Sequence, residues 1–360
     1  MADITDTIRT ERSRTALSVQ AGFLLVGLLL LLLAPFFFYP IFLMKLLCFA
    51  LFACAFNLLL GYTGLLSFGH AAFLGTAAYI SGYGMKTWGL TPELGLLLGT
   101  AVSAAAGFVV GALAIRRQGI YFAMITLALA QMFYFLFLQA PFTGGEDGMQ
   151  AISRGRLFGL IDLASDLRMY YFVLAIFLFA FWLIHRIIHS PFGQILKAIR
   201  ENEARTTSLG YDVARYKLLA FVLSAGLAGL AGATKTLVFQ FATLTDAHWH
   251  TSGEVVLMTL LGGLGTAFGP VVGAGIVVAI QNALADKVGS MITVIMGSIF
   301  VVCVLAFRRG IVGELNALCQ NIVGNRRGRP APCHAAGPAP SHDETPAGAG
   351  VPGRRVEGKA

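Results

Sequence analysis

The sequence predicts an all-α polytopic membrane protein with about ten transmembrane helices and two glycine-interrupted segments in pseudo-repeated halves. Only 12% of the 360 residues are charged and 57% are hydrophobic. An ordinary soluble domain carries roughly 25% charged residues, so half of the usual surface charge is missing. The apolar residues are also concentrated, because residues 15–44 contain no Asp, Glu, Lys, Arg or His. These observations exclude an ordinary soluble enzyme.

Ten apolar runs account for the expected helices, since a helical span needs about 20 predominantly apolar residues. One run, 252–265, is short and rich in glycine, so it is either a crossing helix or a re-entrant segment. The first run is too long for a signal peptide and has no small-residue cleavage site, so we expect a retained span. The runs are 17–38, 41–60, 66–85, 94–115, 119–140, 170–189, 217–242, 252–265, 268–285 and 290–307.

The distribution of Lys and Arg predicts which loops are cytoplasmic. With ten crossings, thirteen of these residues lie in cytoplasmic loops and six outside, as the positive-inside rule requires. A re-entrant 252–265 would place the basic C-terminal part outside, so both termini are expected in the cytoplasm. The chain then consists of a cytoplasmic segment 1–16, a transmembrane domain 17–309 and a cytoplasmic tail 310–360. From about residue 324 the tail is rich in Pro, Gly and Ala, and we expect disorder.

Two segments about 200 residues apart interrupt the helical pattern in similar ways. They are residues 57–75 (NLLLGYTGLLSFGHAAFLG) and 260–273 (LLGGLGTAFGPVVG). Glycine-interrupted spans at corresponding positions of two halves indicate a central pathway, although a single glycine more often serves close helix packing. The candidate pathway residues are Gly61, Gly64, Ser67, Gly69, His70, Gly262, Gly263 and Gly265.

The polar residues of the spans predict transport without catalysis. For His70, a neutral ring that donates to a backbone carbonyl is favoured over contact with substrate. Lys235 is expected to extend toward the outer interface, and His248 and His250 lack a third metal ligand. No Asp or Glu lies at the centre of a predicted span, which disfavours a proton-driven carrier and leaves sodium coupling open. The sequence predicts no catalytic residue, metal or cofactor, and the GxxxxGK-like run at 353–359 lacks its strand and helix.

The longest cytoplasmic loop, 189–217, predicts an amphipathic helix from residue 190 to Gly210. Ser190 is a favourable N-cap and Pro191 suits the first helical position. Four apolar side chains share one face, whereas the charged residues lie largely elsewhere. A helix that rests on lipid would be predominantly basic, so the mixed charge favours docking to a protein partner. The apolar face consists of Phe192, Ile195, Leu196 and Ile199.

Taken together, these motifs resemble the permease family of bacterial branched-chain amino acid ABC importers, of the LivM type. The resemblance covers roughly residues 45–310, and the combination is more specific than any single motif. It implies a permease domain 17–309 in the bacterial inner membrane, with a periplasmic loop 141–169 and a coupling loop 189–217. The matching runs are 57–73, 190–193, 198–204, 209–210, 216–221, 228–233 and 261–270.

The resemblance implies a pathway for leucine, isoleucine and valine, delivered by a periplasmic binding protein. It also implies a heterodimer with a second permease subunit, two cytoplasmic ATPase subunits that hydrolyse the ATP, contact with membrane lipid, and no nucleic acid. Arg205 departs from the family pattern, where a second alanine is common. The alternatives are a permease for urea, a short amide or a sugar, or a secondary transporter without an ATPase. The implied coupling residues are Pro191, Gln194, Arg200, Glu201, Glu203, Arg205 and Gly210.

Overall fold

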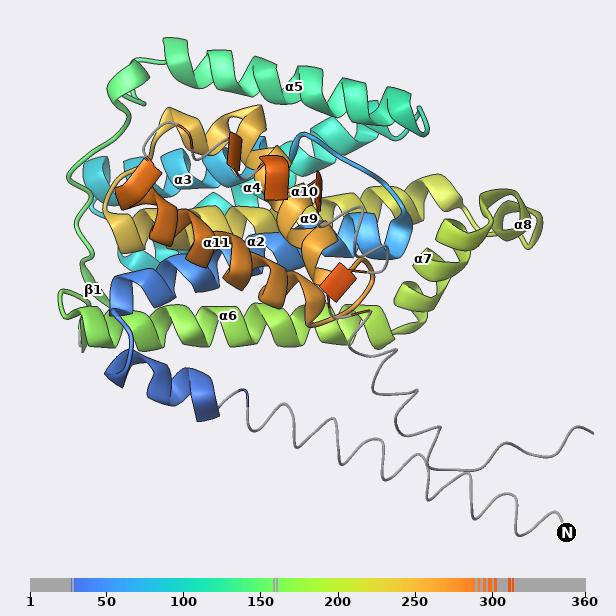
Figure 1. Cartoon of the computed structure of the whole chain (residues 1–360). Coiled ribbons are helices and arrows are strands. Elements are labelled where there is room, and N and C mark those ends of the chain that lie inside the picture. Colours follow the sequence, from blue (N-terminus) through green and yellow to red (C-terminus); the bar gives the residue numbers. More distant parts are fainter. Residues whose placement is uncertain are drawn as a thin grey trace, which may run out of the picture. The chain divides into compact units, whose positions relative to one another are not determined.

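The computed structural model describes residues 27, 29–157, 159 and 161–288, together with isolated positions between 291 and 313. The chain divides into two units, Met1–Leu318 and Cys319–Ala360, and every described residue belongs to the first. The predicted N-terminal segment 1–16 and the tail from about residue 324 lie outside the described residues. What is described is almost entirely helical (Figure 1).

Long helices follow one another along the described chain, and the longest connection between two of them is the segment 140–165 between α5 and α6. A small antiparallel ladder pairs β1 with β2 through Arg156–Asp162 and Leu157–Ile161. The elements are η1 (Ala34–Phe36), α2 (Pro40–Thr63), α3 (His70–Thr87), α4 (Pro92–Ala114), α5 (Ile120–Gln139), η2 (Gly145–Asp147), β1 (Arg156–Leu157), β2 (Ile161–Asp162), α6 (Asp166–His189), α7 (Pro191–Glu201), α8 (Glu203–Ser208), α9 (Val213–Phe239), η3 (Leu244–Ala247), α10 (Trp249–Gly262) and α11 (Gly269–Val288).

Five of the described helices, α2, α4, α5, α6 and α9, are long and apolar enough to cross a membrane. Helix α11 adds a shorter apolar helix over Gly269–Leu284. The mainly helical structure is therefore consistent with the polytopic membrane protein predicted from the sequence, whereas the pseudo-repeated halves stay a prediction. The number of ten spans stays a prediction, because most of run 290–307 and part of run 17–38 lie outside the described residues.

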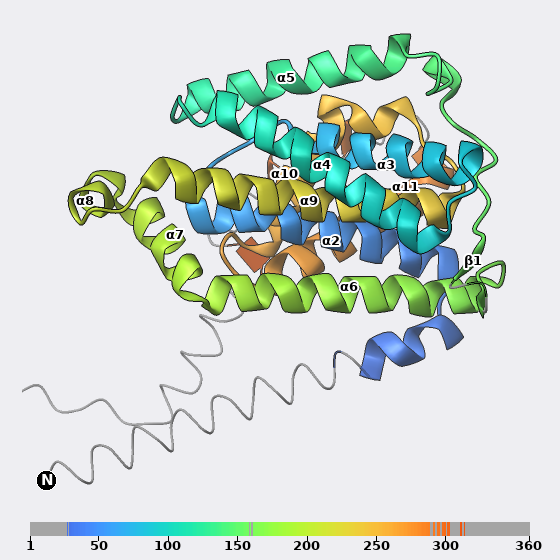
Figure 2. The ribbon, with the colours of Figure 1, turned by 180° about the vertical axis from the view of Figure 1, so that it is seen from behind.

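Helices α2 and α9 form the centre of the described bundle. In the most apolar window of α2, 83% of the residues are buried, against 72% in α9 and 33% or less in α4, α5 and α6. Helix α9 packs against α2, α3 and α4 (Figures 1 and 2). Small residues permit this approach: a Cβ atom on Gly229 would lie 2.3 Å from the Ser103 Cβ, and one on Gly232 would lie 2.1 Å from the Leu74 oxygen.

The two loops predicted to face opposite sides of the membrane lie at opposite ends of the bundle (Figure 1). At one end, Gln118 in the α4–α5 loop donates to Glu203 of α8 at 2.9 Å. At the other end, Met149 pairs with Ala242 beyond α9, and Lys86 donates to the Gln150 oxygen at 2.9 Å. The arrangement thus separates loop 141–169 from loop 189–217 along the direction of the helices.

Candidate functional site

Both glycine-rich segments leave the helical conformation, as the sequence predicts. Residues 64–69 separate α2 from α3, and residues 263–268 separate α10 from α11. Each break contains glycine in a conformation that other residues rarely adopt, with φ of 75° at Gly64, 118° at Gly263 and 74° at Gly265. A larger side chain at these positions would strain the backbone. We call these two segments the first and the second break.

Asn57 joins the second break to α2. Its Nδ2 donates to the Thr266 oxygen at 2.9 Å, and its Oδ1 accepts from the Gly265 backbone nitrogen at 3.0 Å. The side chain is buried, so these hydrogen bonds satisfy amide groups that would otherwise be costly to bury. One turn later, a Cβ atom on Gly61 would lie 2.1 Å from the Asn57 Oδ1 and 2.8 Å from the Gly265 nitrogen. Glycine at position 61 therefore leaves room for this contact.

The first break is held by hydroxyl groups near the start of α3. The backbone nitrogen of Gly69 donates to Ser67 Oγ at 3.2 Å, and that of Ala71 donates to Ser252 Oγ of α10 at 2.9 Å. The first N–H groups of a helix have no partner within the helix, so these hydroxyls supply acceptors. The segment 64–69 is thus fixed by its own Ser67 and by a neighbouring helix.

His70 is the first residue of α3, directly after the first break, and its side chain is buried in the core. Its Nε2 is 2.8 Å from Ser224 Oγ, and that hydroxyl donates to the Ala55 oxygen at 2.6 Å. Because the hydroxyl proton is already used, Nε2 is the donor in the contact between His70 and Ser224. The predicted backbone-carbonyl acceptor is therefore wrong, since the acceptor is a side chain. Three aromatic rings stand edge-on around the imidazole, and they belong to Phe56, Phe73 and Phe221.

The other candidate pathway residues differ in exposure. Gly64 is exposed and Gly265 is half-buried, whereas Ser67, Gly69 and Gly263 are buried. Gly262 is also buried, and a Cβ atom there would lie 1.9 Å from the Gly269 oxygen. Close approach of α10 and α11 thus accounts for Gly262, and a pathway role for this set stays a prediction.

The amphipathic segment after α6 starts as predicted but is divided in two. Ser190 caps α7, because its Oγ accepts from the Gly193 nitrogen at 3.3 Å, and Pro191 occupies the first turn. A single helix to Gly210 is wrong, since Asn202 is extended with φ −158° and ψ 102°. Its Oδ1 accepts from the Arg205 nitrogen at 3.0 Å and begins α8. Asparagine favours this capping arrangement over a helix interior.

The apolar face of α7 packs on the beginning of α9. Leu196 and Ile199 are buried together with Val213 and Ala220 of α9, and the stacked rings of Phe192 and Tyr216 border this cluster. Helix α7 continues past the end of α6, and α8 lies beyond the beginning of α9 (Figures 1 and 2). The exposed predicted coupling residues are Pro191, Gln194, Arg200, Glu201, Arg205 and Gly210.

Two predicted coupling residues also contact other parts of this chain. Arg200 Nη1 donates to the Gly61 oxygen of α2. The Glu203 Oε2 lies 2.7 Å from Lys217 Nζ of α9, and its Oε1 accepts from Gln118 at 2.9 Å. Sequence reasoning missed these partners, and no local pattern indicates them, because Gly61 and Gln118 come from distant segments.

An ion pair is buried at the opposite end of α9. Lys235 pairs with Asp246 of η3, and the two side chains are 15% and 5% exposed. The predicted extension of Lys235 to the interface is therefore wrong, because η3 brings an acid into the bundle. The second Asp246 oxygen is buried without a hydrogen bond. Among the described residues, no three His, Cys, Asp or Glu side chains are grouped to hold a metal.

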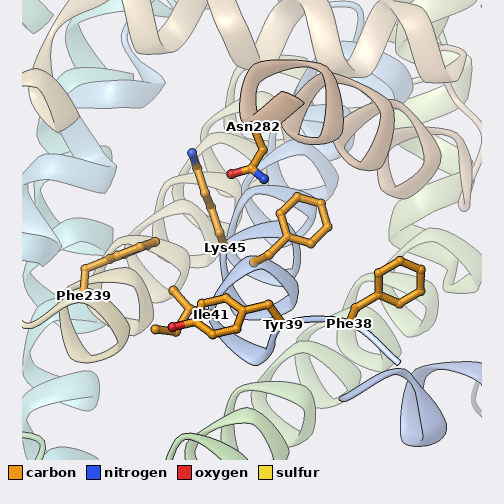
Figure 3. A pocket seen from close by; sticks show the side chains of 7 residues that line it. Phe38, Tyr39, Ile41, Lys45, Phe239 and Asn282 are labelled. Atoms are coloured by element: carbon orange, nitrogen blue, oxygen red, sulfur yellow. The ribbon is translucent and has the colours of Figure 1, made fainter. Parts of the chain in front are cut away.

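A cavity of about 480 Å³ lies near the N-terminal end of α2, away from Gly61. Lys45 and Asn282 contribute its polar groups beside mainly aromatic walls (Figure 3). None of the candidate pathway residues lines it. Its lining residues are Phe38, Tyr39, Ile41, Phe42, Lys45, Phe239 and Asn282.

Known permeases resemble this chain over much of its length. It is 29% identical over 259 residues to the high-affinity branched-chain amino acid transport system permease protein LivM of Salmonella typhimurium. These aligned residues cover 64% of this chain and 60% of that protein. LivM of Escherichia coli is also 29% identical, over 258 residues that cover 64% of this chain and 60% of that protein. The autoinducer 2 import system permease protein LsrC of Klebsiella pneumoniae is 28% identical over 195 residues, 51% of this chain and 53% of that protein.

The match to the two LivM proteins spans about 60% of their length. No solved structure matches the chain. Residues 39–307, which include both breaks and the segment α7–α8, match the family described as the branched-chain amino acid transport system permease component. The chain therefore belongs to this family of transport permeases.

Proposed function

We propose that the chain is a transmembrane permease subunit of an ATP-binding cassette importer. Together with a second permease subunit, it would form the pathway for amino acids delivered by a periplasmic binding protein. The segment α7–α8 carries this proposal, because its apolar face packs on α9 while Gln194, Glu201 and Arg205 are exposed. A cytoplasmic ATPase would bind that open face at Gln194, Glu201 and Arg205, and two such subunits would supply the ATP hydrolysis.

The proposed orientation has ten spans in the bacterial inner membrane with both termini in the cytoplasm. Loop 141–169 would be periplasmic and loop 189–217 cytoplasmic. The positions of these loops at opposite ends of the bundle support this arrangement, as does the excess of Lys and Arg on the proposed cytoplasmic side.

Leucine, isoleucine and valine are the proposed substrates, on the basis of the family and the LivM relatives. In this proposal, backbone groups near the breaks would be the uncharged ligands of the amino acid, because helix N-termini attract carboxylates and free carbonyls attract ammonium groups. The relative LsrC belongs to an autoinducer 2 import system. A different small solute, such as a sugar or a short amide, is therefore the second candidate.

A secondary transporter without an ATPase is the alternative mechanism. The buried Asp246 is an acid of the kind such carriers use, but its pairing with Lys235 gives it a structural partner. Dependence on ATP separates the two mechanisms. The permease pair should be reconstituted into liposomes with its ATPases inside and the binding protein outside, and labelled leucine uptake measured. We expect uptake that requires both ATP and binding protein and that vanadate inhibits. Uptake without ATP, driven by a sodium or proton gradient, would contradict the proposal.

A further inference from the structure

The Arg200 side chain supplies a hydrogen-bond donor to the C-terminal end of α2. Its Nη1 donates to the Gly61 oxygen, which lies in the last turn of α2. No N–H group of the helix reaches its last four carbonyl oxygens, so these oxygens need hydrogen-bond donors from elsewhere. A cation at this end also interacts favourably with the helix dipole. The contact therefore joins α7 to the turn of α2 that precedes the first break.

The same side chain borders both breaks. A Cβ atom on Gly64 would lie 3.3 Å from the Arg200 Cγ, and one on Gly265 would lie 3.1 Å from its Nη1. Both glycines have positive φ, so each marks the irregular backbone of its break. The aliphatic part of Arg200 thus packs at the first break, and its guanidinium reaches the second.

Asn57 extends this connection along α2. It lies one turn before Gly61 on α2 and holds the second break through its hydrogen bonds to Gly265 and Thr266. The last two turns of α2 therefore carry both attachments, one to α7 and one to the second break. A displacement of α7 would move the end of α2 and, through Asn57, the backbone of the second break.

We infer that Arg200 is a positioning residue that, with Asn57, transmits movement of α7 to both breaks. This inference rests on the proposed function, in which an ATPase moves α7. It gives Arg200 an inward role, distinct from a direct contact with the ATPase. Arg200 and Asn57 should then act as one unit, although Asn57 is only 3% exposed.

The test uses the complete complex of both permeases and both ATPases, reconstituted with leucine-loaded binding protein. Arg200→Met keeps the length of the side chain and removes its donors. We expect it to reduce the stimulation of ATP hydrolysis at least tenfold, with basal hydrolysis and the amount of co-purified ATPase unchanged. Asn57→Asp keeps the acceptor for Gly265 and loses the donor to Thr266, so it should give the same separation of basal from stimulated hydrolysis.

Two further variants make the result specific. The double variant Arg200→Met/Asn57→Asp should lose no more stimulation than Arg200→Met alone, because the two residues serve one connection. Arg200→Lys retains a cation that can reach the Gly61 oxygen and should recover part of the stimulation. Arg215→Met is the matched control, because that side chain is 86% exposed on α9 and borders neither break. It should be stimulated like the wild type.

Full stimulation in Arg200→Met would overturn the inference, and so would additive losses in the double variant. Loss of the ATPase from an Arg200→Met permease pair that still forms would also overturn it, by showing that Arg200 is a docking contact. Should the Arg200→Met permease itself fail to fold or to insert, Arg200→Lys and Asn57→Asp are compared instead, and wild-type stimulation in both would refute the connection. An unstimulated wild-type complex would instead contradict the proposed function, and the inference with it.

Discussion

The Glu203 carboxylate lies 2.7 Å from the Lys217 ammonium and joins α8 to the beginning of α9. The lysine side chain is only 6% exposed, whereas that of Glu203 is 35% exposed. Glu203 therefore has a cationic partner within its own chain. A substitution at Glu203 changes the attachment of α8 before it changes any contact with another subunit.

Replacement of Glu203 by Gln should lower the free energy of unfolding by about 1–3 kcal/mol, because a buried ammonium loses a charged hydrogen-bond partner. The cost stays below that of a fully buried pair, since solvent screens the exposed part of Glu203. Thermal unfolding in detergent measures the change. Asp212→Asn is the control, because its pair with Arg215 is exposed on both sides and contributes about 0–1 kcal/mol. Equal shifts in the two variants would contradict the structural role of Glu203.

Charge reversal at the same position should disrupt coupling. Glu203→Lys places a second ammonium beside Lys217, so α8 should detach from α9. We expect ATP hydrolysis to lose its stimulation by loaded binding protein while the permease pair still assembles. Truncation of the tail after Arg329 should leave stimulation intact. Full stimulation in Glu203→Lys would show that Glu203 is not required for coupling to the ATPase.

The buried pair of Lys235 and Asp246 should matter more for stability. Lys235→Met leaves the Asp246 carboxylate buried and unpaired, which costs about 3–5 kcal/mol. The double variant Lys235→Met/Asp246→Asn removes both charges and should recover most of this loss. Unfolding in detergent compares the three proteins. A double variant as unstable as Lys235→Met would show that the charge pair is not the source of the effect.

Glycine at the breaks should be required for transport. Gly61→Ala would place a Cβ atom 2.1 Å from the Asn57 Oδ1 and so disrupt the contact with Gly265. Gly64→Leu and Gly263→Leu would strain backbone of positive φ. We expect each variant to insert into the membrane and to lose leucine uptake. Gly253→Ala on α10 is the control, because a Cβ atom there meets nothing within 4 Å. Normal uptake in the break variants would show that these glycines serve only close packing and are not required for transport.

The proposed orientation predicts which engineered cysteines are accessible from outside. A membrane-impermeant thiol reagent should label a cysteine at Asp162 in intact cells and should not label one at Glu203. Disruption of the cells should make the second position accessible. Of the five native cysteines, Cys48 and Cys54 are buried and should not interfere, and Cys303, Cys319 and Cys333 are replaced by Ser before labelling. Labelling at Glu203 in intact cells, with none at Asp162, would reverse the orientation.

Local features of this protein could be predicted from the sequence, whereas its long-range contacts could not. The glycines mark both breaks, and Ser190 with Pro191 marks the start of α7, because backbone preferences depend on neighbouring residues. The pairing of Asn57 with Gly265 joins residues 208 positions apart, so only the packed structure reveals it. The acid partner of Lys235 was missed for a related reason, since Asp246 follows the helix in a turn that folds back into the bundle.

The most direct test of the central claim is ATP hydrolysis by the reconstituted complex when leucine-loaded binding protein is added. The comparison is between the wild type and a variant in which the exposed residues Gln194, Glu201 and Arg205 are all replaced by Ala. These side chains face away from the cluster that holds α7 on α9, so the variant should fold and insert normally. We expect clear stimulation in the wild type and none in the triple variant. Undiminished stimulation in the triple variant would contradict coupling through α7–α8, and an unresponsive wild-type complex would contradict its assignment to an ATP-driven importer.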